Sequence, residues 1–216
     1  YIAQKLLKGA LGTNNFDANS RLCMSSAVAG YNLSLGSDGP PCCYEDLDHY
    51  TVAFLIGTNT AECHPVLFQR LLKRKKQHPD KVKIIVIDPR LTDTAKAADI
   101  YLPVAPGSDL ALLYGIAHLV LKKNGQNTEF IENHTDKYSE FLEIIKTWTP
   151  RRVARFCGIP EQKLEEVANM FNHHERVAPP LVNGCKSRKE GLQCWRTYQS
   201  HFYGQIGKKG RAFFTT

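Results

Sequence analysis

The stretch Val52-Ala53-Phe54-Leu55-Ile56-Gly57-Thr58-Asn59 decides the fold of this chain. Its five consecutive apolar residues are typical of a strand buried on both faces of a parallel sheet, and Gly57 to Asn59 interrupt the run with turn-forming residues. Toward the C-terminus, the apolar spacing predicts a helix over 65–77, strands over 82–87 and 100–104, and a helix over 109–123 that Ser108 caps. This alternation predicts an α/β fold with a parallel, Rossmann-like sheet and flanking helices.

The remaining segments define three predicted regions. Residues 1–125 form the α/β domain, which includes an N-terminal helix over 1–11 and a segment of small residues over 20–30. Residues 126–175 form a helical insertion, with helices over 128–133, 138–147, 150–157 and 160–171. Residues 176–216 contain a return strand over 177–182 and a basic tail.

Composition excludes several classes of protein. The 216 residues carry a net charge of +7, and residues 1–149 are electrically balanced, so the excess lies in the last third. No apolar run reaches the roughly 20 residues of a membrane span. Seven cysteines without a regular spacing argue against a secreted disulfide scaffold and a zinc ribbon and favour a reducing compartment. The chain lacks an initiator Met and opens inside an amphipathic pattern, which indicates a part of a longer chain.

Three turns at the predicted strand ends carry polar groups. At the turn over 57–61, backbone N–H groups and a helix dipole favour a phosphate, although a tight turn without a ligand fits as well. Asp88 can accept hydrogen bonds from a ribose or a base, or form a turn before Pro89. Asp109 can accept from a guanine edge or complement the start of its helix.

Two further features have a functional and a structural interpretation. Cys23 lies in the small-residue segment, where a thiolate at a helix start binds soft or redox metals, but a buried, inert cysteine also fits. The basic run Lys73 to Lys76 fits a solvated helix face.

Taken together, five segments resemble the molybdopterin oxidoreductases of the dimethyl-sulfoxide-reductase superfamily in order and spacing. They span 19–31, 39–47, 56–65, 86–90 and 106–109. The segment Cys23-Met24-Ser25-Ser26-Ala27-Val28 resembles the corresponding segment of nitrate reductases. The segment Gly39-Pro40-Pro41-Cys42-Cys43-Tyr44 resembles that of the assimilatory type. After residue 181, where most of the positive charge lies, the resemblance becomes loose, and we can place no motif of the family over 211–216.

The resemblance implies a role for each matching residue. Cys23 is implied to be the catalytic thiolate that ligates molybdenum, and Asn19 to touch the cofactor beside it. One molybdopterin guanine dinucleotide is implied to contact three turns, formed by Ile56, Gly57, Thr58, Asn59, Thr60, Ala61, Glu62 and Cys63, by Ile87, Asp88, Pro89, Arg90 and Leu91, and by Gly107, Ser108 and Asp109.

The resemblance also implies an activity. The expected reaction is nitrate reduction to nitrite by oxygen-atom transfer at a bis(molybdopterin guanine dinucleotide) molybdenum centre, in a cytoplasmic enzyme. Electrons are implied to come from a ferredoxin, a flavoprotein or an NAD(P)H module through a [4Fe-4S] cluster that these residues do not bind. We expect no membrane or nucleic-acid partner, and no turnover by the 216 residues alone.

Three alternatives stay open at this point. A periplasmic nitrate reductase or another molybdopterin oxidoreductase lies within the same family. A nucleotide-binding module without redox activity would use the same polar strand ends. A basic interaction domain would use the C-terminal third, and it would bind nucleic acid in a salt-dependent manner.

Overall fold

Four parallel strands form the centre of the molecule. A computed structural model of the chain describes residues 1–19, 28–30, 32, 44–173 and 177–178. The strands are β1 (Val52–Ile56), β2 (Lys83–Ile87), β3 (Ile100–Leu102) and β4 (Val177–Ala178), in the order β3-β2-β1-β4. Every adjacent pair is parallel, which confirms the predicted parallel α/β sheet. Only the first two residues of the strand predicted over 177–182 lie within the described residues.

Alternate residues of β1 belong to two different hydrophobic cores. Val52, Phe54 and Ile56 pack into the core on one face of the sheet, and Ala53 and Leu55 pack into the core on the other face. All five are buried. Because successive side chains of a strand point to opposite faces, a strand covered on both sides has to be apolar throughout, and this explains the continuous run in the sequence.

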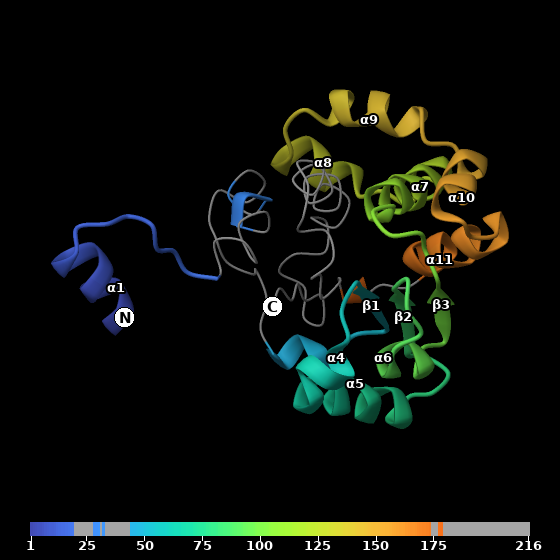
Figure 1. Cartoon of the computed structure of the whole chain (residues 1–216). Helices are drawn as coiled ribbons and strands as arrows, with labels where there is room; N and C mark the ends of the chain where they lie inside the picture. Colours follow the sequence, from blue (N-terminus) through green and yellow to red (C-terminus); the bar gives the residue numbers. More distant parts are fainter. Residues whose placement is uncertain (20–27, 31, 33–43, 174–176, 179–216) are drawn as a thin grey trace.

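Each face of the sheet is covered by a different set of helices (Figure 1). The connections β1–β2 and β2–β3 run through α4 (Thr60–Cys63), α5 (Pro65–Gln77) and α6 (Asp93–Lys96), and Phe68 and Leu71 of α5 pack on the Ala53 face. The opposite face carries α7 (Asp109–Lys122), α10 (Pro150–Cys157) and α11 (Glu161–His173). Helices on both faces confirm a doubly wound arrangement of the Rossmann type.

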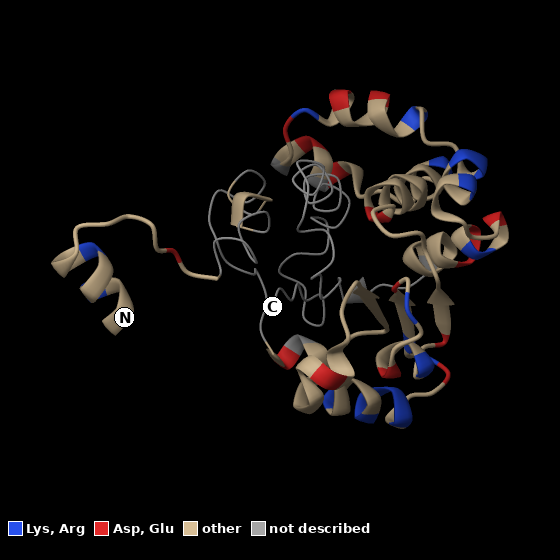
Figure 2. Ribbon diagram, in the orientation of Figure 1, with Lys and Arg blue, Asp and Glu red and all other residues tan. Residues whose placement is uncertain are grey.

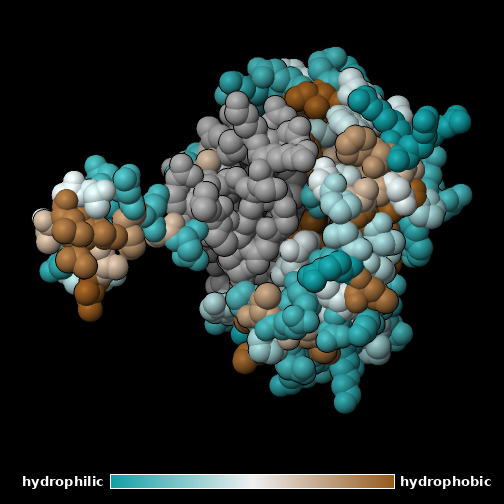
Figure 3. All heavy atoms as spheres, in the orientation of Figure 1, coloured by the Kyte–Doolittle hydropathy of each residue, from teal (hydrophilic) through white to brown (hydrophobic). Residues whose placement is uncertain are grey.

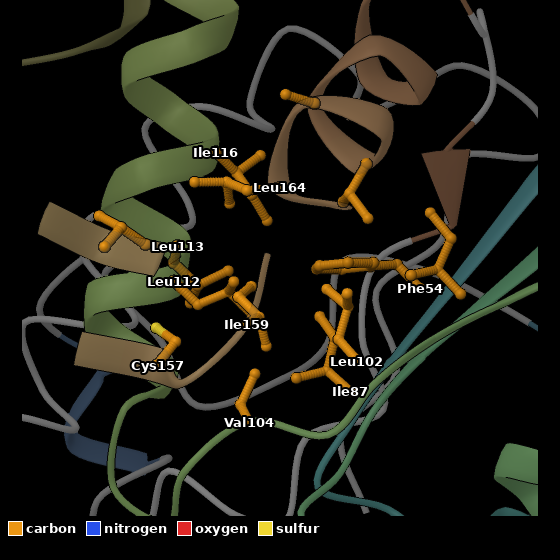
Figure 4. Packing of buried hydrophobic residues seen from close by; sticks show 14 of the residues in the cluster. Phe54, Ile87, Leu102, Val104, Leu112, Leu113, Ile116, Cys157, Ile159 and Leu164 are labelled. Carbon is orange, nitrogen blue, oxygen red and sulfur yellow. The ribbon is translucent and has the colours of Figure 1, made fainter. Parts of the chain in front are cut away.

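The larger core lies between the sheet and these three helices (Figure 4). Phe54 of β1 meets Phe171 of α11 edge to face, with ring centroids 5.0 Å apart. Gly115 lets α7 approach its neighbours closely, because a Cβ there would lie 2.8 Å from Cγ1 of Val153 and 3.1 Å from Cδ2 of Leu164. The interior leaves no room for a side chain at that position.

The helical insertion packs on α7 through its own small core. It contains α8 (Thr128–His134) and α9 (Tyr138–Lys146) in addition to α10 and α11. Ile145 of α9 joins Tyr114 and Ala117 of α7 in a third hydrophobic cluster. The helices over this region confirm the predicted helical character, while the division of the chain at residues 125 and 175 stays a prediction.

Several predicted boundaries shift by one or two residues for physical reasons. The third strand ends at Leu102 rather than at residue 104, because Pro103 has no N–H to donate to a ladder and the Val104 amide turns back to the Leu102 carbonyl at 3.0 Å. Gly158 ends α10 in the left-handed conformation at φ 72°, as predicted for a C-cap.

The structure adds three short elements that the sequence pattern does not reveal: η2 (Tyr44–Asp48), α4 and α6.

The N-terminal helix is present but differs in type. It consists of α1 (Ile2–Gln4) and a π-helical segment, η1 (Lys5–Ala10), and neither contains a buried residue. Ile2 and Leu6 are exposed and Leu7 is half-buried, and Figure 3 shows the hydrophobic surface of this segment. Among the described residues, no helix has the length and apolar character needed to cross a membrane.

Basic side chains gather on the outer side of α5 (Figure 2). Lys73 and Lys76 are exposed there, as predicted for a solvated helix face. Lys75 departs from this prediction, because it forms a 2.9 Å ion pair with Asp99 and is largely screened from solvent.

Candidate functional site

The ends of three strands lie level at one edge of the sheet. Ile56 pairs with Ile87, and Ile87 pairs with Leu102, so the turns that follow β1, β2 and β3 start side by side. From β1 the chain moves outward to β2 and β3, and it then returns to the other side of β1 with β4. Open parallel sheets bind ligands at the carboxyl edge where the strand order reverses in this way, and the turn after β1 borders that point.

Buried polar side chains in the described residues gather at this edge. All six follow the carboxyl end of β1, β2 or β3 within seven residues; they are Thr58, Thr60, Asp88, Thr92, Thr94 and Ser108. Burying a polar group is costly unless it is hydrogen-bonded. Their concentration marks this edge as different from the rest of the apolar interior.

The turn after β1 is fixed by hydrogen bonds to both neighbouring segments. Gly57 adopts a φ of 58°, which favours glycine, and its amide donates to the Ile87 carbonyl at 2.8 Å. The Ala61 amide donates to the Thr94 hydroxyl at 2.8 Å, and that hydroxyl donates to the Asn59 side-chain oxygen at 2.9 Å.

This network corrects the physical reason for a phosphate site at the turn. The sequence interpretation relied on unpaired N–H groups at the start of a helix. The helix that follows, α4, has only four residues, and one of its first amides is already bonded to Thr94. The polar character of the turn therefore comes from the side chains of Thr58, Thr60 and Asn59 more than from a helix dipole.

Asp88 forms the turn after β2 and still presents an acceptor. Its Oδ1 accepts from the Arg90 amide at 2.8 Å, the local bond of an Asx-turn, and its relative exposure is 6%. The turn-forming interpretation is thus confirmed. A carboxylate has two oxygens, so a ligand role for the second oxygen is compatible with the turn and stays a prediction.

The turn after β3 is closed by Ser108, in a different manner from the one expected. The Ser108 hydroxyl donates to the Ala105 carbonyl at 2.6 Å, and it makes no capping bond to α7. The predicted side-chain cap is wrong, because the hydroxyl is already used to close its own turn. Asp109 follows, and burial together with the negative charge of Asp88 raises the pKa of its carboxyl. A ligand that donates hydrogen bonds to the carboxylates of Asp88 and Asp109 would stabilise the charged form of Asp109, which burial and the charge of Asp88 disfavour.

Cys157 supports this last turn, although sequence reasoning gave it no role. Its carbonyl accepts from the Ala105 amide at 2.9 Å, and its thiol donates to the Ser108 carbonyl at 3.7 Å. The side chain is fully buried in the core beside Val104 and Ile159 (Figure 4). In the sequence, Cys157 is visible only as a cysteine directly before a helix-ending glycine. That position carries no information about a contact with a residue 49 positions away.

Cys63 and Cys157 are expected to differ in reactivity. Burial raises the pKa of the Cys157 thiol to about 11, so at pH 8 only about one molecule in a thousand carries the reactive thiolate. Cys63 is exposed. In the 216-residue chain, iodoacetamide at pH 8 should label Cys63 and leave Cys157 unmodified, as read by peptide mass spectrometry. Urea should make both reactive, and equal labelling without urea would contradict the buried position of Cys157.

The other predicted site residues differ in how close they lie to this edge. Ile56 and Ile87 are buried strand ends. Gly57, Asn59, Ala61 and Asp109 are half-buried. The members of the three turns that are exposed are Glu62, Cys63, Pro89, Arg90, Leu91 and Gly107. Asn19 is exposed as well, and Cys23 lies outside the described residues. Within the described part of the chain, no group of three or more His, Cys, Asp or Glu side chains is placed to hold a metal ion.

Known proteins of two kinds are similar to this chain over nearly its whole length. A nitrate reductase from Synechocystis sp. is 50% identical over 217 residues, which cover the whole chain and 30% of that relative. The F420-dependent formate dehydrogenase subunit alpha of Methanocaldococcus jannaschii is 35% identical over 97% of the chain and 31% of that relative. The chain therefore spans less than a third of the length of these curated relatives.

A solved structure and a family model agree with them. Acetylene hydratase from Pelobacter acetylenicus superimposes with a TM-score of 0.74 and 25% sequence identity, over 88% of this chain and 25% of the hydratase. The family model described as molybdopterin oxidoreductase matches residues 1–213, and this range contains all three polar turns as well as the strands that align them. The chain belongs to the molybdopterin oxidoreductase family.

Proposed function

We propose that this chain is the central part of a molybdenum-dependent nitrate reductase, in which the sheet edge binds one molybdopterin guanine dinucleotide. The observation that carries the proposal is the gathering of the buried polar side chains at the level ends of β1, β2 and β3. Membership of the family implies a molybdenum–pterin cofactor. Similarity to a nitrate reductase supports nitrate as the substrate.

The groups at this edge suit a ligand that combines phosphates, ribose and a base. The turn after β1 supplies donors, the amide of Asn59 and one hydroxyl of the Thr58–Thr60 pair, whose other proton is used in their mutual 3.3 Å hydrogen bond. The turns after β2 and β3 supply acceptors, the carboxylates of Asp88 and Asp109. Phosphate oxygens need donors, and ribose hydroxyls and guanine N–H groups need acceptors. The residues present therefore fit a guanine dinucleotide laid across the three turns.

The bound cofactor supplies the redox chemistry, in which nitrate takes up two electrons and two protons and yields nitrite and water. The residues of this chain bind and orient it. We assign the thiolate ligand and catalytic role to Cys23 and a cofactor contact to Asn19, and the turns at the carboxyl ends of the strands would hold the dinucleotide.

The parent enzyme is proposed to be cytoplasmic and to receive its electrons through a [4Fe-4S] cluster held by other residues. A ferredoxin, a flavoprotein or an NAD(P)H module would act as donor. The free thiols of Cys63 and Cys157 accord with a reducing compartment, where disulfides are rare.

Formate oxidation is the second candidate. Its support is the 35% identity to the formate dehydrogenase subunit, over nearly the whole chain. The two reactions differ in the direction of electron flow: nitrate takes electrons from the enzyme, whereas formate delivers electrons to it.

The substrate test uses the full-length enzyme and two dyes. With a reduced viologen, we expect nitrate to be consumed and nitrite to appear. Because each viologen donates one electron, one nitrite should form for every two dye molecules oxidised. With an oxidised viologen and formate, we expect no dye reduction. The 216-residue chain alone should be inactive in both assays. Formate-dependent dye reduction without nitrite formation would replace the nitrate reductase by the second candidate.

A further inference from the structure

Thr94 connects two functional turns at the carboxyl edge of the sheet. It lies in α6, after β2, and its side chain is fully buried. Its hydroxyl reaches back to the turn after β1, where it contacts both Asn59 and Ala61. Helices α4 and α6 pack against each other at this point. α6 itself is held by Thr92, whose hydroxyl accepts from the Ala95 amide at 3.2 Å.

The direction of the two hydrogen bonds defines the orientation of the Asn59 amide. The Thr94 oxygen accepts from the Ala61 amide at 2.8 Å. Its single proton then goes to Oδ1 of Asn59, at 2.9 Å. In the structure the Thr94 hydroxyl thus accepts from a backbone amide and spends its one proton on the Asn59 oxygen, so the bonds run from Ala61 through Thr94 to Asn59.

Consequently the oxygen of the Asn59 side chain is engaged by Thr94, and its NH₂ group is the end left to donate to a ligand beside the turn. Asn59 is half-buried, and its Nδ2 donates to no residue in the part of the chain that the structure describes. The oxygen and the NH₂ group of a side-chain amide are nearly equal in shape, but the first accepts hydrogen bonds and the second donates them. An outward NH₂ attracts phosphate oxygens, whereas an outward carbonyl would repel them.

We propose that Thr94 is a positioning residue of the cofactor site, which holds the Asn59 amide in the orientation that donates to a phosphate of the dinucleotide. The inference rests on the proposed function, since it takes the turn after β1 as part of the cofactor site. It assigns a role to a residue that touches no ligand and acts through Asn59.

The test measures cofactor retention by the full-length enzyme. Molybdenum per polypeptide is followed by elemental mass spectrometry during dialysis of the wild type and of T94V, T94S and N59A. T94V removes the hydroxyl and keeps the side-chain shape, and we expect it to lose molybdenum on the order of 10-fold to 100-fold faster than the wild type. T94S keeps the hydroxyl and should stay near the wild-type rate.

The double variant T94V/N59A separates positioning from general support of the fold. If Thr94 acts through Asn59, its replacement should add little to the loss already caused by N59A, because the two changes then remove the same interaction. Additive losses would overturn the inference, as would wild-type retention by T94V. Should T94V fail to fold, an unchanged retention in N59A would overturn it, and fast loss in N59A with normal retention in T94S would support it. A wild-type enzyme that holds no molybdenum would instead refute the proposed function.

Discussion

Replacing Cys23 with alanine in the full-length enzyme is expected to reduce both molybdenum content and nitrate reduction to background. The proposed role of Cys23 is that of a thiolate ligand, and a methyl group has no lone pair with which to bind a metal. Thiolates suit soft and redox-active metals better than oxygen ligands do, so a water molecule is a poor substitute. The measurements are molybdenum per polypeptide and nitrite formed from nitrate with a reduced viologen.

The matched control is Cys185→Ala, which removes a thiol outside the residues assigned to the cofactor. It should retain molybdenum and activity, so that a loss in Cys23→Ala is specific to the position. Molybdenum content that does not depend on Cys23 would refute the ligand assignment. If the parent protein bound guanine nucleotides and no molybdenum, the sheet edge would be a nucleotide-binding module without redox activity.

Phe54→Ala is expected to lower the free energy of unfolding by about 3–5 kcal/mol, the usual cost of removing a buried phenylalanine ring. Phe54 is fully buried and packs edge to face against Phe171, so its loss leaves a cavity between the sheet and α11. Native domains are stable by only about 5–15 kcal/mol, which makes this a large fraction of the total. The measurement is the midpoint and slope of urea unfolding followed by circular dichroism.

Val66→Ala serves as the control for this core substitution. Val66 lies on α5 with a relative exposure of 81%, and exposed positions usually change stability by less than about 0.5 kcal/mol. Equal effects of the two substitutions would contradict the assignment of Phe54 to the core. Because Phe54 lies three residues before Gly57, its loss should also weaken cofactor retention, which Val66→Ala should leave unchanged.

The elements that could be predicted from sequence are those whose cause is local. The strand over 52–56 and the helices over 65–77 and 150–157 begin and end at the predicted residues, because continuous apolar runs, proline at a helix start and glycine at a helix end act within a few residues. The short helices α4 and α6 escaped prediction, since four residues contain too little of a helical period.

The candidate site divides along the same line. The polar turns after β1, β2 and β3 could be located in advance, because each follows a recognisable strand. The contacts that shape them could not. Thr94 bonds to Asn59 across 35 residues, and Cys157 bonds to Ser108 across 49. Ser108 was expected to cap α7 and instead closes its own turn, because several acceptors lie within reach of one hydroxyl and only the folded geometry selects among them.

The sequence by itself therefore determined that this protein has a parallel α/β sheet with polar groups at the carboxyl ends of its strands. Hydrophobic periodicity and turn residues encode such features along the chain. Only the tertiary structure decided which of these polar groups bond to one another and in which orientation, as in the Asn59 amide bonded by Thr94. A hydrogen bond depends on distances of tenths of an ångström between segments far apart in sequence, and packing of the whole sheet and its helices sets those distances.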